Sequence, residues 1–152
     1  MVELLIVIAI IALAVGLMTA ALPDGDAAKL EEEGARLTAL LDSARAEARV
    51  AGVPVRWVPR PGAAGNADGV AHFVFVGLPA SLQMPTRWLD PRPTAFIVGG
   101  STVLLGPEAI LPPQRIILRL DDRRLELASD GLGSFLVPPP RLDAAAAAAA
   151  TR

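Results

Sequence analysis

Residues 4–18 read LLIVIAIIALAVGLM, and this stretch decides the fold because each of its residues is apolar or glycine. Together with residues 19–22 it forms a run of 19 residues. As an α-helix this run spans roughly 28 Å, close to the ~30 Å hydrocarbon core of a bilayer. Lipid offers no hydrogen-bond partners to a backbone, so a segment that crosses it must be helical. The sequence therefore predicts a transmembrane helix over residues 1–22.

A cleaved secretory signal peptide is the alternative interpretation of this run. The small residues Thr19, Ala20 and Ala21 resemble a cleavage site. Three features favour a retained anchor instead. No basic residue precedes the run, the run exceeds the usual length of about 7–15 apolar residues, and an acid, Glu3, stands at its start.

Glu3 has two interpretations. An acid at the first turn of a helix favours the positive pole of the helix dipole, so Glu3 can be a simple interfacial residue. A carboxylate beside a membrane span also carries a free-energy cost that a cation in a membrane assembly would offset. The local residues leave both interpretations open.

The order Met1-Val2-Glu3-Leu4-Leu5, followed by the apolar run, resembles the N-terminus of type IV pilins and type II secretion pseudopilins. In that family prepilin peptidase cuts after a short basic leader that ends in Gly. The mature chain then begins with N-methylated Phe, followed by Thr, Leu, a hydrophobic residue and Glu. The resemblance aligns Glu3 with the family's Glu and implies that it pairs with the N-terminal ammonium of a neighbouring subunit. The leader, its Gly, the Phe and the Thr have no counterpart here.

The segment 23–52 is predicted to be an amphipathic helix. Pro23 interrupts the preceding run, and Gly52 and Pro54 are typical of a helix end. The apolar stripe of this helix, with spacings of four and three, consists of Leu30, Gly34, Leu37, Leu41, Ala44 and Ala48. The stripe is narrow and rich in alanine, which suits a helix that lies against a sheet better than a free coiled coil.

The charged residues of this segment are expected to form a solvated outer face. Glu31, Glu32 and Glu33 lie in the early turns, and Arg45 and Arg49 lie in the last ones. This distribution suits the helix dipole.

Two further segments carry a resemblance to one branch of the family. Residues 35–55 contain Ala-Arg-Ala-Glu-Ala at 44–48 and Gly-Val-Pro-Val at 52–55, and they resemble secretion protein H and its FimT-like pilus relatives. The segment 124–133, RLELASDGLG, resembles the close of protein H domains.

Beyond residue 53 the pattern is that of short strands separated by Gly, Pro, Asn and Asp. Runs 115–120 and 125–128 predict a hairpin. The other predicted strands are 53–60, 70–76, 95–105 and 134–137. The predicted fold class is α+β: a long N-terminal pilin helix, transmembrane and then amphipathic, packed on a small antiparallel β-sandwich head at 53–137. The Pro/Ala-rich tail at 138–152 is predicted to be disordered.

Catalytic and metal sites are not expected. The chain has 152 residues and a formal net charge of −2. It contains no Cys, so thiol nucleophiles and thiolate metal sites are excluded. His72 is the only histidine, no Ser lies in a Gly-x-Ser-x-Gly turn, and no Gly-rich loop precedes a Lys. We expect no enzyme activity and no cofactor.

Nucleic-acid binding is the competing hypothesis from another class. Its candidate residues are Arg115, Arg119, Arg123 and Arg124. Asp121, Asp122 and Glu126 lie among them and are expected to neutralise their field, so nucleic acid is not a favoured partner.

The resemblance implies a minor pseudopilin of the type II secretion system. Its anchor would lie in the inner membrane, with the N-terminus cytoplasmic and the head periplasmic. The implied partners are the major pseudopilin, the other minor pseudopilins and prepilin peptidase. A FimT-like minor type IV pilin is the alternative.

A prediction follows from the missing leader. We expect the DNA upstream of Met1 to encode, in frame, a basic stretch ending in Gly-Phe-Thr, with translation starting earlier than Met1. Sequencing of the upstream region checks this. An in-frame stop codon directly before Met1 would contradict it.

Overall fold

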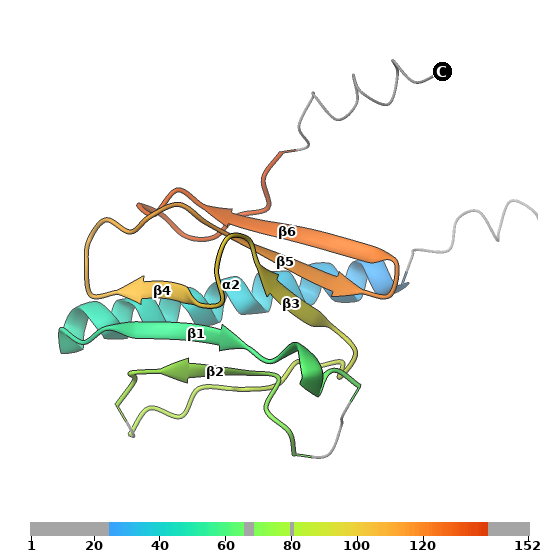
Figure 1. Cartoon of the computed structure of the whole chain (residues 1–152), viewed down its shortest axis with the longest axis horizontal. Coiled ribbons are helices and arrows are strands. Elements are labelled where there is room, and N and C mark those ends of the chain that lie inside the picture. The colour runs from blue at the N-terminus through green and yellow to red at the C-terminus, as the bar shows by residue number, and fades with distance from the viewer. Residues whose placement is uncertain (1–24, 66–68, 80, 140–152) are drawn as a thin grey trace, which may run out of the picture.

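The computed structural model describes residues 25–65, 69–79 and 81–139 (Figure 1). The predicted transmembrane helix, Glu3 and the motif at residues 1–5 lie outside these ranges, as does nearly all of the predicted tail. Within the described ranges no helix has the length and apolar character needed to cross a membrane.

The described chain forms one α-helix, a 3₁₀ turn and six strands. These are α2 (Gly25–Ala51), β1 (Val55–Pro59), η1 (Pro61–Ala63), β2 (Phe73–Val76), β3 (Thr94–Ile97), β4 (Val103–Gly106), β5 (Gln114–Leu120) and β6 (Arg123–Ser129). The strands make two antiparallel sheets of three, ordered β2-β1-β4 and β3-β5-β6. The predicted combination of one helix with two small antiparallel sheets is confirmed.

Helix α2 runs along both sheets, which lie in front of it in Figure 1. All six residues of the predicted apolar stripe are buried. A Cβ at Gly34 would collide with the end of the Leu125 side chain on β6, so the small residue allows α2 to lie close to that strand. The helix ends before Gly52, whose φ of +65° lies in the left-handed region that favours glycine.

The core fills the space between α2 and the inner faces of the sheets. Its aromatic centre is Phe73, whose ring centroid lies 4.6 Å from that of Trp88 and 5.8 Å from that of Trp57. The two sheets meet through β1 and β3. The Gln114 side chain also joins them, because its amide exchanges two hydrogen bonds with the backbone of Leu104, at 2.7 and 3.0 Å.

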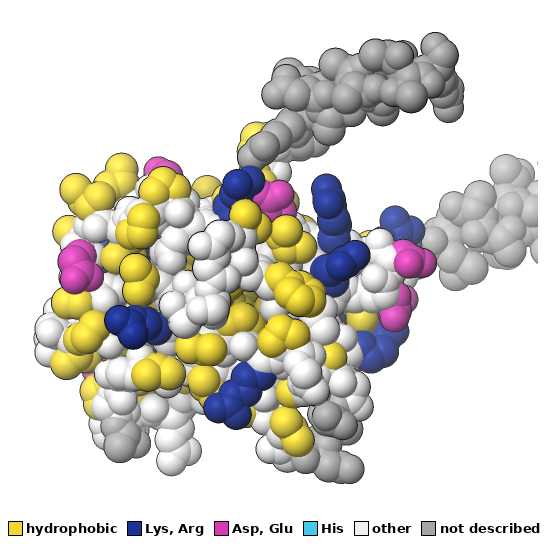
Figure 2. Space-filling model, in the orientation of Figure 1, with side chains coloured by type: hydrophobic (Ala, Val, Ile, Leu, Met, Phe, Trp, Pro, Cys, Tyr) yellow, Lys and Arg dark blue, Asp and Glu magenta, His cyan; other side chains and the backbone are white. Residues whose placement is uncertain are grey.

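The predicted hairpin is confirmed, with β5 and β6 joined across Asp121 and Asp122. Asp121 has a φ of +50°, as two-residue hairpin turns require. The even-numbered residues Ile116, Leu118 and Leu120 are buried, so the odd-numbered residues of β5 point away from α2. Figure 2 shows this outer face, where hydrophobic and basic side chains gather over the strands and acidic ones lie mostly toward the margins.

Two strand predictions are wrong. The run 95–105 is two strands in different sheets, because the chain turns at Gly99, with φ +79°, so that β3 pairs with β5 and β4 pairs with β1. The run 134–137 makes only an isolated bridge between Leu136 and Ala128. Pro138 and Pro139 follow directly and have no N–H groups with which to extend that pairing.

Candidate functional site

Glu33 faces the core, which corrects the prediction that the glutamates of α2 are all solvated. It is 1% exposed. Its Oε1 accepts hydrogen bonds from the backbone N–H groups of Leu89 and Asp90, the latter at 3.2 Å. Its Oε2 lies 3.4 Å from Nη1 of Arg36. A buried carboxylate needs such partners, and Glu33 thereby fixes the long loop between β2 and β3 against the helix.

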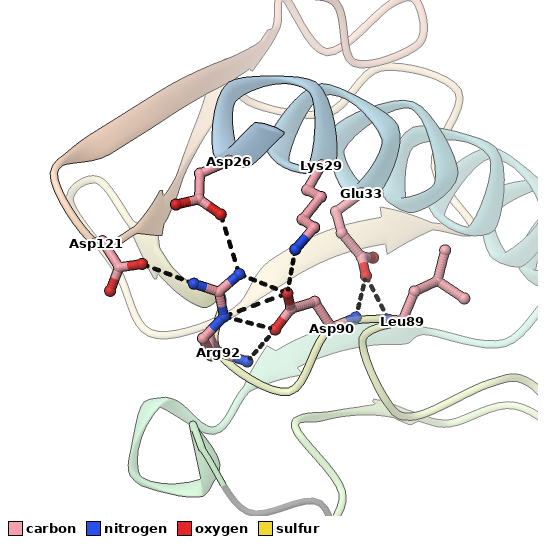
Figure 3. Close-up of polar contacts among 7 residues, drawn as sticks. All are labelled: Asp26, Lys29, Glu33, Leu89, Asp90, Arg92 and Asp121. Atoms are coloured by element: carbon pink, nitrogen blue, oxygen red, sulfur yellow. Dashed lines mark hydrogen bonds and ion pairs between the residues drawn. The ribbon is translucent and has the colours of Figure 1, made fainter. Parts of the chain in front are cut away.

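Arg92 lies at the centre of a polar cluster at the first turn of α2 (Figure 3). Its guanidinium contacts Asp90 at 2.7 Å, Asp121 at 2.9 Å and Asp26 at 3.0 Å. Lys29 Nζ lies 3.5 Å from Asp90. We call Arg92 with its three aspartates the Arg92 cluster. It joins three separate parts of the chain: the start of α2, the β2–β3 loop and the β5–β6 turn.

The charges of this cluster stabilise one another. The hydrogen bond from Arg92 lowers the pKa of Asp90 from 3.8 to about 2, against the opposing effect of its partial burial. The hydrogen bonds to Asp90 and Asp26 raise the pKa of Arg92 above its ordinary value. These ion pairs hold the three segments of the chain together.

Arg45 forms the second joint, toward the other end of α2. It was also predicted to be solvated, yet it is only 9% exposed. Its guanidinium donates hydrogen bonds to the carbonyl oxygens of Gly131 at 2.6 Å and Gly133 at 2.7 Å. Its Nε has no hydrogen-bond partner among the described residues. We call Arg45 with the loop 130–133 the Arg45 clamp.

The loop of the Arg45 clamp is shaped to present its carbonyl groups. Gly131 has a φ of +91°, and a Cβ there would collide with the carbonyl of Leu111. The Asp130 carboxylate accepts hydrogen bonds from the backbone N–H groups of Leu132 and Gly133, at 2.9 and 3.1 Å. The bond from Gly133, followed by that from Leu132, lowers the pKa of Asp130. The segments 44–48 and 124–133 thus meet at Arg45.

The sequence carried a signal for both buried charges. Glu33 lies three residues after Leu30, and Arg45 lies four residues after Leu41. Both therefore fall on the apolar stripe. Had the helical period been applied to charged residues as well as to leucines, it would have predicted that Glu33 and Arg45 are buried.

The four candidate arginines do not form one patch. Because side chains alternate along a strand, Arg115, Arg119 and Arg124 share the outer face of the β3-β5-β6 sheet, and Arg123 lies on the opposite face. Arg119 and Arg124 are directly opposite each other. Of the acids expected to neutralise them, Glu126 pairs with Arg115 at 3.6 Å, whereas Asp121 is bound to Arg92.

His72 has a structural position. It is 4% exposed, and its Nδ1 accepts a hydrogen bond from the backbone N–H of Trp88 at 3.0 Å. Among the residues that the structure describes, no three His, Asp or Glu side chains are grouped so as to hold a metal ion.

No family model, curated protein or solved structure matches this chain. Its function is therefore inferred from its own residues and geometry. The main structural feature is the attachment of α2 to the head at two points. The Arg92 cluster joins them near the start of the helix, and the Arg45 clamp joins them near its end.

The Arg45 clamp generates a stability prediction. Arg45→Met keeps the volume of the side chain but leaves the carbonyl groups of Gly131 and Gly133 without their donor. We expect the free energy of unfolding to fall by about 2–3 kcal/mol. Arg49→Met is the matched control, because Arg49 is exposed and, among the described residues, has a single long hydrogen bond, 3.3 Å to Ala109 O. It should cost at most about 1 kcal/mol. Urea unfolding of both variants measures this, and equal losses would contradict a special role for Arg45.

The Arg92 cluster generates a pH prediction. Because folding lowers the pKa of Asp90 from 3.8 to about 2, its ionisation stabilises the fold above about pH 4, and this contribution is lost as the pH falls toward 2. Asp90→Asn should therefore be less stable at pH 6 and lose less stability between pH 4 and 2 than the wild type. Asp122→Asn, at an exposed neighbouring aspartate, should follow the wild-type curve. Thermal unfolding across this range checks the prediction, and parallel curves for Asp90→Asn and the wild type would refute it.

Proposed function

We propose that this chain is a pilin-like structural subunit of a bacterial envelope machine, a minor pseudopilin of type II secretion resembling protein H. In this proposal residues 1–22 remain as an inner-membrane anchor, and the β-rich head lies in the periplasm. The chain takes part in assembly and is not an enzyme. Its partners are the major pseudopilin and other minor pseudopilins, and prepilin peptidase processes it.

One observation carries the proposal: a 19-residue apolar run with an acid at its start leads into a helix that is joined firmly to a small β head. From Asp26 to Arg45 the helix extends about 28 Å. Over this distance the Arg92 cluster and the Arg45 clamp connect it to the head. A helix held in this way transmits displacement of the anchor to the head, as a subunit that is moved into and out of a filament requires.

Glu3 has a defined role in the proposal, taken from the resemblance. Its carboxylate pairs with the N-terminal ammonium of a neighbouring subunit. Opposite charges attract far more strongly in a low-dielectric setting than in water, although their desolvation takes back much of that gain. The benefit lies in register, because a single charge pair aligns otherwise uniform apolar helices.

A FimT-like minor type IV pilin, involved in pilus assembly or DNA uptake, is the second candidate. The outward-facing Arg119 and Arg124 favour it, since neither has an ion-pair partner among the described residues. Against it, Arg123 lies on the other face and Arg115 is paired with Glu126, which leaves a small cationic area for phosphate binding.

The proposal predicts the behaviour of Glu3→Ala. The variant should still insert into the inner membrane, because removal of a charge only increases the apolar character of the run. It should fail to co-purify partner pseudopilins from detergent-solubilised membranes. Glu108→Ala, at an exposed glutamate of the head, is the control and should co-purify them normally. Normal partner recovery with Glu3→Ala would exclude Glu3 as the assembly contact.

A further inference from the structure

Two arginines lie directly opposite each other on the outer face of the β3-β5-β6 sheet, the face seen in Figure 2. Ala128 exchanges its backbone hydrogen bonds with Leu136, on the side of β6 away from β5. This direction repeats at every second residue of a strand, so the N–H and C=O of Arg124 also point away from β5. Arg119 and Arg124 therefore form a pair without mutual hydrogen bonds, the kind whose Cα atoms lie only about 4.5 Å apart. We call these two residues the arginine pair.

The arginine pair has no partner of opposite charge among the described residues. Both side chains are exposed, and neither forms an ion pair there. Glu126, on the same face of β6, pairs instead with Arg115 at 3.6 Å. Asp121, in the adjoining turn, pairs with Arg92 at 2.9 Å, and Asp122 forms no ion pair with either arginine. Like charges directly opposite each other destabilise a sheet, and such local conflicts are expected at functional sites.

An apolar row lies next to the arginine pair on the same face. Phe96 of β3 and Ile117 of β5 are directly opposite each other, and Phe96 is 43% exposed. Along the strands this row is about 7 Å from the row of Thr94 and Arg119. We call the arginine pair with Phe96, Ile117 and Thr94 the Arg–Phe face. Arginine and aromatic side chains are enriched at the centres of protein–protein interfaces, which makes this face a candidate binding surface.

The charges around the arginine pair indicate which anion it can bind. Glu126 occupies the next outward position of β6 after Arg124, and across the sheet the same row offers only Thr94 beyond the two arginines. A nucleic acid carries a phosphate about every 3.4 Å along each strand, so a strand laid along β6 would bring phosphates against Glu126. A single carboxylate held between two guanidinium groups avoids this repulsion and matches their planar geometry. The pattern therefore favours one acidic side chain of a protein over nucleic acid.

We propose that the Arg–Phe face binds another pseudopilin of different sequence, at a surface where an acidic side chain lies next to an apolar one. The inference rests on the proposed function, in which this chain is a minor subunit among other pseudopilins, and it specifies which face of the head meets one of them. The arginine pair holds the carboxylate of the partner, and Phe96 with Ile117 covers the neighbouring apolar side chain. Because the carboxylate offsets the repulsion between the arginines, that repulsion is uncompensated only in the free subunit.

The test is photo-cross-linking of the full chain in the membranes of the bacterium that encodes it. Substitution of Phe96 by p-benzoylphenylalanine keeps an aromatic side chain on the face and makes it photoreactive. The same substitution at Val76, 51% exposed on β2 of the other sheet, is the matched control. Mass spectrometry identifies the adducts after irradiation. We expect position 96, and not position 76, to give an adduct with another pseudopilin, recognised by an apolar N-terminal run with an acid at its start.

Arg119→Glu separates a binding role of the arginine pair from a structural one. The substitution places opposite charges across the two strands, so it should raise the melting temperature of the full chain in detergent. It should nevertheless lower the adduct yield from position 96 about tenfold, because the partner's acid then meets a like charge. Arg56→Glu, at an exposed arginine on the outer face of the other sheet, should leave the yield unchanged. Once the adduct locates the partner's acid, its replacement by arginine should restore much of the yield with Arg119→Glu.

Four outcomes would overturn the inference. The first is no adduct with another pseudopilin from position 96, and the second is an adduct only with a second copy of this chain. The third is an adduct yield that is insensitive to Arg119→Glu. The fourth is a salt-sensitive gel shift of a DNA duplex by the full chain that Arg119→Glu abolishes, since it would assign the arginine pair to nucleic acid.

Failure of this inference is distinguishable from failure of the proposed function. If Arg119→Glu leaves the adduct unchanged while Glu3→Ala still abolishes co-purification of partners, only the assignment of the Arg–Phe face is wrong. If the arginine-dependent adduct with a pseudopilin forms but Glu3→Ala co-purifies partners normally, the Arg–Phe face stands and the proposed role of Glu3 fails.

Discussion

The burial of two charges on the inner face of α2 is the constraint on which the arrangement of the head depends. A carboxylate or a guanidinium that leaves water must find hydrogen-bond partners in the protein. Glu33 takes backbone N–H groups from the β2–β3 loop, and Arg45 takes carbonyl groups from the loop after β6. The helix therefore specifies the position of two loops that have little secondary structure of their own.

Apolar and polar contacts of α2 stabilise the head in different ways. The apolar stripe of α2 supplies burial along the sheets, and this burial has no direction. The polar contacts fix the orientation of the loops relative to α2, because a guanidinium donates hydrogen bonds only to acceptors that lie along its N–H groups. Near the start of α2, Arg92 adds a second fixed point that includes the β5–β6 turn. Helix α2 is consequently connected to the sheets and their loops near both of its ends.

The outer surfaces follow from the same packing. Once Ile116, Leu118 and Leu120 face the helix, the pleat directs Arg115, Ile117 and Arg119 outward. Where α2 lies close to β6, a groove runs beside them, and Glu31 and Gly34 are among its lining residues. A mixed apolar and basic face and an acidic apolar groove thus arise on one chain whose net charge is only −2. Sequence composition shows none of this separation, since it does not say which side chains share a face.

The sequence by itself determined the local elements: the bounds of α2, the hydrophobic stripe on it, the β5–β6 hairpin and the combination of one helix with small antiparallel sheets. Each of these depends on periodicity or turn chemistry within a few residues. Only the tertiary structure decided that 95–105 divides between two sheets, that Glu33 binds the β2–β3 loop, and that Arg45 binds the loop after β6. Those outcomes depend on partners distant in sequence, such as Gly131, 86 residues from Arg45. Local pattern places a side chain on a face of its own helix or strand, but the group that it meets there is fixed by long-range packing.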